Sequence, residues 1–206
     1  MPAHVEWFDK VINFPPRAYI DTSYLLYLKS YLTHRTDIRY QSCKNFYDKM
    51  IAHNVSMYTS VLSLEEAIYI ILYKYGVSRD MKNFQDRNGN AFSKISDFRK
   101  ERRREFIQSY KKNLAGVIDF IQFFFNLGIR LAFPKSYIIP TSSRKFTVKD
   151  KSGSVANYAF GLIKKYELDP MDAFHVAIAK CLGIDHIVST DKGLKVINEI
   201  KLFCYN

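Results

Sequence analysis

Short apolar segments that alternate with helical segments constrain the fold of this chain most strongly. The apolar segments span residues 18–20, 55–60, 128–133 and 186–190, with a fifth candidate at 201–205. The helical segments predicted between and around them are 22–34, 40–54, 63–76, 154–166, 170–180 and 192–200. Strands separated by helices, with no tight hairpin turn joining them, are typical of parallel sheets. The sequence therefore predicts an α/β fold: a parallel β-sheet of four or five strands flanked by helices.

A basic and aromatic segment, residues 77–126, interrupts this alternation. Its first part, 77–94, is polar and contains Asn-Gly-Asn, which predicts a loop. From Ile95 onward apolar residues recur at helical spacing, which predicts a long amphipathic helix capped by Ser96 and broken near Gly116. Because 206 residues are few for two full domains, we predict one domain, residues 1–206, with a basic helical insertion at 77–126.

The positive charge is concentrated in two stretches. The formal net charge is +11; residues 74–112 hold 12 Lys/Arg against 5 Asp/Glu, and residues 135–151 hold 5 against 1. A concentrated surplus favours binding of a polyanion, because each neutralised phosphate releases counterions. For the run at residues 99–105, a solvated helix face is the alternative interpretation.

Cysteine spacing and hydropathy indicate a reducing compartment and no membrane span. Cys43, Cys181 and Cys204 are far apart and form neither a disulfide framework nor a zinc motif. The N-terminal residues lack the unbroken apolar run of a signal peptide, and the most apolar segment, 117–133, contains charged residues. We therefore predict a cytoplasmic protein.

Two aspartates directly follow predicted strands. Asp21 comes after the strand at 18–20, and Asp191 after the strand at 186–190, with the hydroxyl residues Thr22, Ser189 and Thr190 beside them. In open α/β sheets, ligands bind outside the carboxyl ends of the strands. Each aspartate could instead only cap the helix that follows it.

A third aspartate opens a helix. Asp169 before Pro170 is a strong capping arrangement, which places Asp172 in the first helical turn. Asp172 is then available to a cation, with His175 on the same side of the helix. For His175 the favoured interpretation is a half-buried side chain; a neighbour of a metal site and a phosphate contact are the alternatives.

Glu66 is the fourth candidate carboxylate. It lies on the helix predicted at 63–76, and its neighbour Glu65 points about 100° away, so only one can face inward. Glu66 shares its side with aromatic and apolar residues, whereas Glu65 is predicted to be exposed. Four carboxylates that lie together at the ends of strands and the starts of helices repel one another unless a hard cation is bound. Mg²⁺ or Mn²⁺ is the cation that such oxygen ligands favour.

These residues resemble the motif pattern of the PIN-domain nucleases, and within them that of the VapC-type toxin ribonucleases. A strand ending in Asp-Thr is matched at Asp21, and a Ser followed six residues later by a Glu at Ser60 and Glu66. A helix opening in the form DAxxxA is matched at Asp172, and a strand ending in Thr/Ser-x-Asp at Asp191. The resemblance covers roughly residues 17–76 and 127–205.

The resemblance implies a PIN-like fold and a divalent-metal-dependent endoribonuclease that cleaves single-stranded RNA. Asp21, Glu66, Asp172 and Asp191 would hold Mg²⁺ or Mn²⁺ and hydrolysis would leave a 5′-phosphate and a 3′-hydroxyl. The candidate substrate-binding residues are Thr22, His175, Ser189, Thr190, Arg102, Arg103 and Arg104. Residues 192–195 lack the further acidic residue of many members, which does not favour a strong second metal site.

The resemblance also implies RNA and an antitoxin protein as partners. The aromatic surplus on the helices favours a homodimer. One alternative is a non-catalytic RNA- or protein-binding module on the same scaffold. Another is an RNA-processing nuclease that has no antitoxin. An aspartyl phosphatase and a Rossmann dehydrogenase are disfavoured, because the first predicted strand is followed by Asp-Thr-Ser and not by DxD or a glycine-rich turn.

Overall fold

The chain is described by a computed structural model that defines residues 4–30, 35–132, 139–140, 146–147 and 155–206. It divides into two compact units. The first comprises Met1–Ser63 and Ile129–Asn206, and the second comprises Leu64–Gly128. The insertion predicted at residues 77–126 lies within the second unit, which begins earlier along the chain. The single domain over residues 1–206 stays a prediction.

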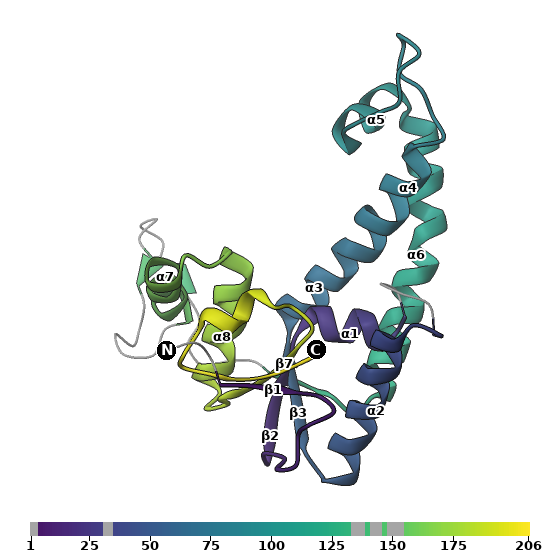
Figure 1. The fold of residues 1–206 in the computed structure, drawn as a ribbon. Coiled ribbons are helices and arrows are strands. Elements are labelled where there is room, and N and C mark those ends of the chain that lie inside the picture. Colours follow the sequence, from purple (N-terminus) through teal and green to yellow (C-terminus); the bar gives the residue numbers. More distant parts are fainter. Residues whose placement is uncertain (1–3, 31–34, 133–138, 141–145, 148–154) are drawn as a thin grey trace. The chain divides into compact units, whose positions relative to one another are not determined.

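Within the described part of the first unit, six strands form one parallel sheet (Figure 1). In the order of the sheet, they are β1 (His4–Trp7), β8 (Lys201–Cys204), β7 (His186–Ser189), β2 (Arg17–Ile20), β3 (Ser56–Ser60) and β4 (Arg130–Ala132). Every neighbouring pair is parallel. The predicted α/β fold with a parallel sheet is therefore confirmed. The sheet has six strands where four or five were predicted, because β1 is a short, partly polar edge strand.

Four helices flank this sheet: α1 (Thr22–Leu28), α2 (Ile38–Ala52), α7 (Val155–Tyr166) and α8 (Pro170–Cys181). A 3₁₀ helix, η2 (Gly193–Val196), follows β7 and is shorter than predicted, because Ile197 is already extended. Helix α1 is also shorter than predicted. Ser30 has a φ of 62°, a left-handed conformation that a right-handed helix cannot contain; residues 31–34 of that prediction lie outside the described residues.

The two faces of the sheet bury different side chains. Tyr19, Ile187 and Leu202 pack with α7 and α8 in one apolar cluster. The alternate residues point to the other face, where Phe203 contacts Phe46 of α2 with ring centroids 5.6 Å apart. Figure 1 shows α7 and α8 on one side of these strands and α1 and α2 on the other. The period-2 alternation of the strands thus fixes which face each helix covers.

The second unit contains helices that begin with the continuation of α3 (Val61–Tyr69). This helix passes into a π-helix, η1 (Ile70–Val77), and then into α4 (Ser78–Met81). After a loop come α5 (Ile95–Glu101) and α6 (Arg103–Asn126). The long helix predicted from residue 95 is therefore broken at Arg102, where ψ is 54°, and not near Gly116.

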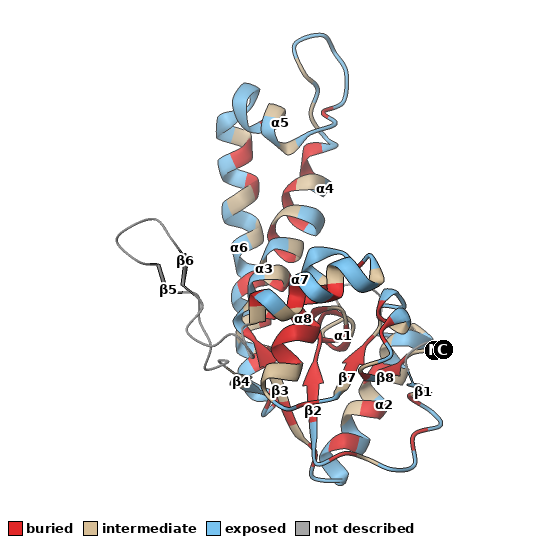
Figure 2. Ribbon diagram, turned by 90° about the vertical axis from the view of Figure 1, so that its left-hand side faces the viewer, coloured by how far each residue is buried: buried red, intermediate tan, exposed pale blue. Residues whose placement is uncertain are grey.

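The cap predicted for that helix is also wrong. Lys94 occupies the N-cap position without a side-chain hydrogen bond, and the Ser96 hydroxyl instead donates to Asp97. The break at Arg102 lets Phe98 and Phe106 pack into the same small core, together with Val77, Met81 and Phe92. Figure 2 shows this burial on the facing sides of α4 and α6.

A buried carboxylate joins α4 to α6 within the second unit. The Asp80 side chain accepts hydrogen bonds from Ser109 Oγ at 2.9 Å, Asn113 Nδ2 at 3.1 Å and Lys112 Nζ at 3.3 Å. Burial alone would raise the pKa of Asp80, but these three hydrogen bonds lower it. Gly76 allows the close packing, since a Cβ there would lie 2.6 Å from the Asn113 side chain.

Three sequence-based expectations concern the rest of the chain. All three cysteines are free thiols, in agreement with the predicted absence of a disulfide framework. Across the described ranges, no helix has the length and apolar character needed to cross a bilayer. The basic segment at 135–153 lies mostly outside the described residues, apart from an antiparallel pair formed by β5 (Ile139–Pro140) and β6 (Phe146–Thr147).

Candidate active site

The sheet order brings Asp21 and Asp191 to the same edge. Strands β2 and β7 are neighbours, with Tyr19 opposite Ile187 and Ile20 opposite Val188. Both strands are parallel, so their carboxyl ends coincide, and the Asp21 amide donates to the Val188 carbonyl oxygen at 3.0 Å. Two residues that are 170 positions apart in the sequence thus leave adjacent strands side by side.

Asp21 is held by two hydroxyl groups. Its Oδ2 atom accepts hydrogen bonds from Ser23 Oγ and from Ser189 Oγ, each at 2.7 Å. The side chain is only 6% exposed, and it also caps α1 by accepting from the Ser23 amide at 3.4 Å. Ser23 also accepts from the Thr190 amide at 3.1 Å. These bonds fix the direction of the Asp21 carboxylate, and they leave its Oδ1 atom on the side of His175.

Ser23 contacts the Asp21 carboxylate but is not among the candidate residues predicted from the sequence, where Thr22 is the candidate next to Asp21. Thr22 is 2% exposed, and its hydroxyl donates to the Ser63 carbonyl oxygen at 3.4 Å, inside the packing of α1. The signal in the sequence was the position of Ser23 two residues after an N-cap aspartate, from which a side chain reaches back to the cap.

Asp191 is oriented by backbone groups at the end of β7. Its Oδ1 accepts from the Gly193 amide at 2.7 Å, and its own amide donates to Ser189 Oγ at 2.9 Å. A Cβ on Gly193 would lie 3.1 Å from Asp191 Oδ1 and 3.6 Å from Asp172 Oδ2. The carboxylates of Asp172 and Asp191 therefore flank the same glycine.

The pKa of Asp172 is raised by its burial and by the charges of the other aspartates. As predicted, Asp169 caps α8 by accepting from the Met171 amide at 2.9 Å, with Pro170 as the first helical residue, so Asp172 lies in the first turn. Burial raises the pKa of Asp172 to about 7, helped by the negative charges of Asp191, Asp21 and Asp169 and opposed by His175. A carboxylic acid with a pKa near neutrality is a frequent mark of a functional site, because structural carboxylates are usually ionised.

His175 is buried next to the Asp21 carboxylate. It is 2% exposed, so the expectation of a half-buried side chain is wrong, and the burial does not favour the predicted direct contact with substrate. Its Nε2 is 3.8 Å from Asp21 Oδ1, and its Nδ1 is 3.0 Å from the Tyr19 hydroxyl. His175 therefore fits the role of a positioning residue for Asp21.

Tyr19 extends this arrangement into the protein interior. Its hydroxyl lies 2.8 Å from Ser60 Oγ and 3.2 Å from Ser63 Oγ, and the residue is fully buried. The chain of polar contacts runs from Asp21 through His175 and Tyr19 to Ser60. Buried polar groups linked in this way hold one geometry, because breaking any link leaves a partner unsatisfied.

Tyr19→Phe is expected to lower the free energy of unfolding by about 1–3 kcal/mol, because it removes the shared hydroxyl from three buried polar groups. Urea unfolding followed by circular dichroism measures this change. Tyr27→Phe is the matched control, since Tyr27 is only half-buried and its hydroxyl bonds the exposed Arg39. Equal effects of the two substitutions would contradict the structural role given to Tyr19.

Glu66 and the three arginines belong to the second unit. Glu66 is half-buried and Glu65 exposed, in agreement with the predicted difference between them. The role of Glu66 at the metal stays a prediction. Arg102 donates to the Gln85 carbonyl oxygen at 3.3 Å, whereas Arg103 and Arg104 line surface hollows on α6.

A hollow of about 320 Å³ adjoins the end of β7 in the first unit. Its lining residues are Tyr27, Arg39, Thr190, Lys192 and Tyr205. Thr190 lines this hollow, and its backbone amide donates to Ser23, which contacts the Asp21 carboxylate. The hollow therefore borders the carboxylates. Two cations and two aromatic rings are suited to a ligand with a negative charge and a flat unsaturated ring.

The carboxylates have the composition of a magnesium or manganese site but not its closed geometry. Within the ranges that the structure describes, no three His, Cys, Asp or Glu side chains are close enough to hold one ion together. The donors themselves fit a hard divalent cation: the three aspartates supply oxygen atoms, and their repulsion adds to burial in raising the pKa of Asp172. Binding of one ion by all three therefore requires side-chain movement.

Comparison with known proteins does not identify the family of this chain. No protein-family model matches the chain, and no curated protein matches it significantly. The resemblance to PIN-domain nucleases thus rests on the sequence motifs alone.

Proposed function

We propose that this protein is a divalent-metal-dependent endoribonuclease that hydrolyses phosphodiester bonds of single-stranded RNA. The observation that carries the proposal is that Asp172, in the first turn of α8, lies near Asp21 and Asp191 at the carboxyl ends of β2 and β7; burial, helped by the charges of these aspartates, raises the pKa of Asp172 to about 7. These side chains come from three distant parts of the chain. A group of like charges that is costly in isolation is expected where a cation binds.

In this proposal Asp21, Asp172 and Asp191 hold Mg²⁺ or Mn²⁺. The bound ion supplies a Lewis acid for the phosphodiester and lowers the pKa of a nearby water. Ser23 and Ser189 fix the direction of the Asp21 carboxylate by hydrogen bonds, and His175 lies next to its other oxygen atom, Oδ1. Hydrolysis leaves a 5′-phosphate and a 3′-hydroxyl.

The hollow beside the carboxylates supports a nucleotide substrate. Lys192 and Arg39 can approach a phosphate, and the rings of Tyr27 and Tyr205 can stack on an unpaired base. Arg39 is held by its ion pair with Asp37, at 2.7 Å between Nη2 and Oδ2. An unpaired base is needed for such stacking, which favours a single-stranded substrate.

The remaining parts of the proposal concern context. Glu66 is included as a further ligand, direct or through water. A cytoplasmic location, an antitoxin partner and a homodimer are part of the same proposal. An RNA-processing nuclease that has no antitoxin is the alternative form of it.

A second candidate function is a non-catalytic binding module. The observation that favours it is that two of the three carboxylates already accept local backbone hydrogen bonds: Asp21 from Ser23 and Asp191 from Gly193. Such carboxylates can be explained as caps alone. Metal-dependent cleavage separates the two candidates.

Asp191→Asn is expected to lower Mn²⁺-dependent cleavage of a labelled single-stranded RNA by roughly 100-fold, because losing a hydrogen-bond partner of a metal ligand alone often costs about 10–100-fold and this change removes a proposed ligand itself. The parent should cleave with Mn²⁺ and not with EDTA. Asp185→Asn is the matched control: Asp185 directly precedes the same strand, at its other end, and pairs with Lys180 at 2.6 Å. No cleavage by the parent protein with Mn²⁺ would favour the binding module, whereas parent activity in EDTA, or equal losses in both variants, would contradict the proposed metal site.

A further inference from the structure

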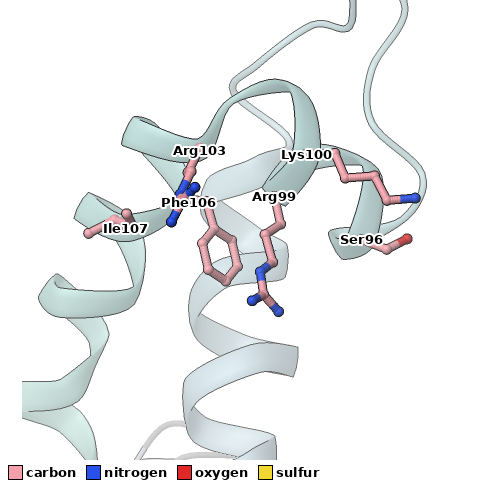
Figure 3. Close-up of a pocket in the computed structure, with 6 residues that line it drawn as sticks. All are labelled: Ser96, Arg99, Lys100, Arg103, Phe106 and Ile107. Atoms are coloured by element: carbon pink, nitrogen blue, oxygen red, sulfur yellow. The ribbon is translucent and has the colours of Figure 1, made fainter.

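A second hollow lies between α5 and α6 in the second unit and has a volume of about 640 Å³ (Figure 3). The residues that line it are Ser96, Arg99, Lys100, Arg103, Phe106 and Ile107. Three of the six are cations and none is acidic. This composition differs from that of the aspartate site, so the two hollows have different chemistry.

The cations of this hollow are not neutralised locally. Over the part of the chain that the structure describes, Arg99, Lys100 and Arg103 form no ion pair with a carboxylate. All three are exposed. A concave surface with unpaired cations raises the local concentration of an anionic ligand.

The basic surface continues along α6. A shallower hollow of about 410 Å³ is lined by Arg103, Arg104, Ile107, Gln108 and Lys111. Arg103 and Ile107 belong to both hollows, which are therefore contiguous. Together they present five cations, two from α5 and three from the first turns of α6, enough for several consecutive phosphates.

Apolar surface lies between these cations. Figure 3 shows the Arg99 guanidinium beside the Phe106 ring, and its Cζ atom is 5.8 Å from the ring centroid. Ile107 is 39% exposed. Phosphate-binding cations around an apolar surface match a single strand, whose bases are uncovered, better than a duplex, whose base faces are stacked inside.

The three consecutive arginines predicted to bind substrate, Arg102, Arg103 and Arg104, have different surroundings in the structure. Arg102 already donates to the Gln85 carbonyl oxygen at the helix break, whereas Arg103 and Arg104 face the hollows. Arg99 and Lys100 join them because the break at Arg102 folds α5 back beside α6.

We propose that the second unit binds a segment of single-stranded RNA across these two hollows, without a divalent ion. Phosphates contact Arg99, Lys100, Arg103, Arg104 and Lys111, and a base lies against the exposed side chain of Ile107. The choice of RNA over DNA rests on the proposed ribonuclease function, whereas the binding surface is independent of the carboxylate site.

The test measures binding of the full chain to a fluorescein-labelled 12-nucleotide oligouridylate in EDTA, by fluorescence anisotropy over a range of salt concentrations. Arg99→Ala/Arg103→Ala is expected to raise Kd roughly 10- to 30-fold near 0.1 M salt and to reduce the slope of log K against log salt by about 1.4. Lys74→Ala/Lys82→Ala is the matched control, because it removes the same charge from exposed positions of the same unit outside both hollows. This control should change Kd less than threefold.

Each other outcome overturns the proposal. Equal losses in the two double variants would show that only net charge matters. Equal affinity for a DNA strand or an RNA duplex of the same length would remove the choice of single-stranded RNA. The EDTA condition separates this test from the proposed nuclease activity. Loss of Mn²⁺-dependent cleavage in Asp191→Asn with unchanged RNA binding in EDTA is the result that both claims predict, whereas parent protein that cleaves but does not bind in EDTA would overturn this one alone.

Discussion

Asp172→Asn is expected to abolish measurable RNA cleavage, with a loss of about 100-fold or more in rate. The substitution keeps the size of the side chain and removes the carboxylate that the other aspartates influence most strongly. It also removes a charge from the first turn of α8, which costs the helix only a few tenths of a kcal/mol. A large loss of activity in a folded protein would therefore reflect the site and not the helix.

Asp169→Asn is the control that separates capping from chemistry. Asp169 lies three residues earlier on the same helix and accepts from the Met171 amide at 2.9 Å. Asparagine is as good an N-cap as aspartate, so this variant should retain cleavage within about threefold of the parent. Comparable losses in Asp169→Asn and Asp172→Asn, or parent activity in Asp172→Asn, would contradict the role given to Asp172.

The affinity for Mn²⁺ is expected to fall roughly 25-fold when the pH is lowered from 7.5 to 5.5. A carboxylate must be deprotonated to bind a cation, and the pKa of Asp172 is about 7, so a proton competes with the ion throughout this range. Isothermal titration calorimetry at several pH values measures the change. An affinity that is flat between these pH values would show that Asp172 is not a ligand or is already ionised.

The same pKa determines how the metal-free protein responds to pH. Because the pKa of Asp172 is raised in the folded state, its contribution to stability is fully present below the unfolded pKa of about 4. That contribution is lost as the pH rises through about 7. In EDTA, Asp172→Asn should therefore match the parent at pH 4 and be more stable at pH 8. The difference should be about 1–2 kcal/mol, because the side chain is only partly buried and solvent screens its charge.

The three aspartates could be chosen from the sequence because their signals are local. Asp21 and Asp191 directly follow apolar strands, and Asp172 follows a cap made by Asp169 and Pro170. A parallel sheet then brings the strand ends together without further information. The prediction of the fold succeeded for the same reason, since β2, β3 and β7 alternate with helices that have clear caps.

The contacts around the aspartates could not be chosen in this way. His175 and Tyr19 are 156 residues apart, and their 3.0 Å contact depends on how α8 packs on β2. An isolated tyrosine in an apolar strand carries no sign that its hydroxyl serves three partners. Burial of His175 is likewise a result of tertiary packing, and this is why the expectation of a half-buried side chain failed.

The second unit shows a different limit. Helical periodicity continues from α5 into α6, so the sequence contains no signal for the break at Arg102, which depends on the packing of Phe98 and Phe106. The glycine at position 116 suggested a break, but its neighbours are held in α6. As a result, Arg99 and Lys100 were treated as part of a charge run and not as the lining of a hollow.

The most direct test of the central claim is the anomalous diffraction of crystals of this protein grown with Mn²⁺. The account predicts one peak within coordination distance of carboxylate oxygens of Asp21, Asp172 and Asp191. A Mn²⁺ peak elsewhere on the molecule, with these three side chains making only their local hydrogen bonds, would contradict it.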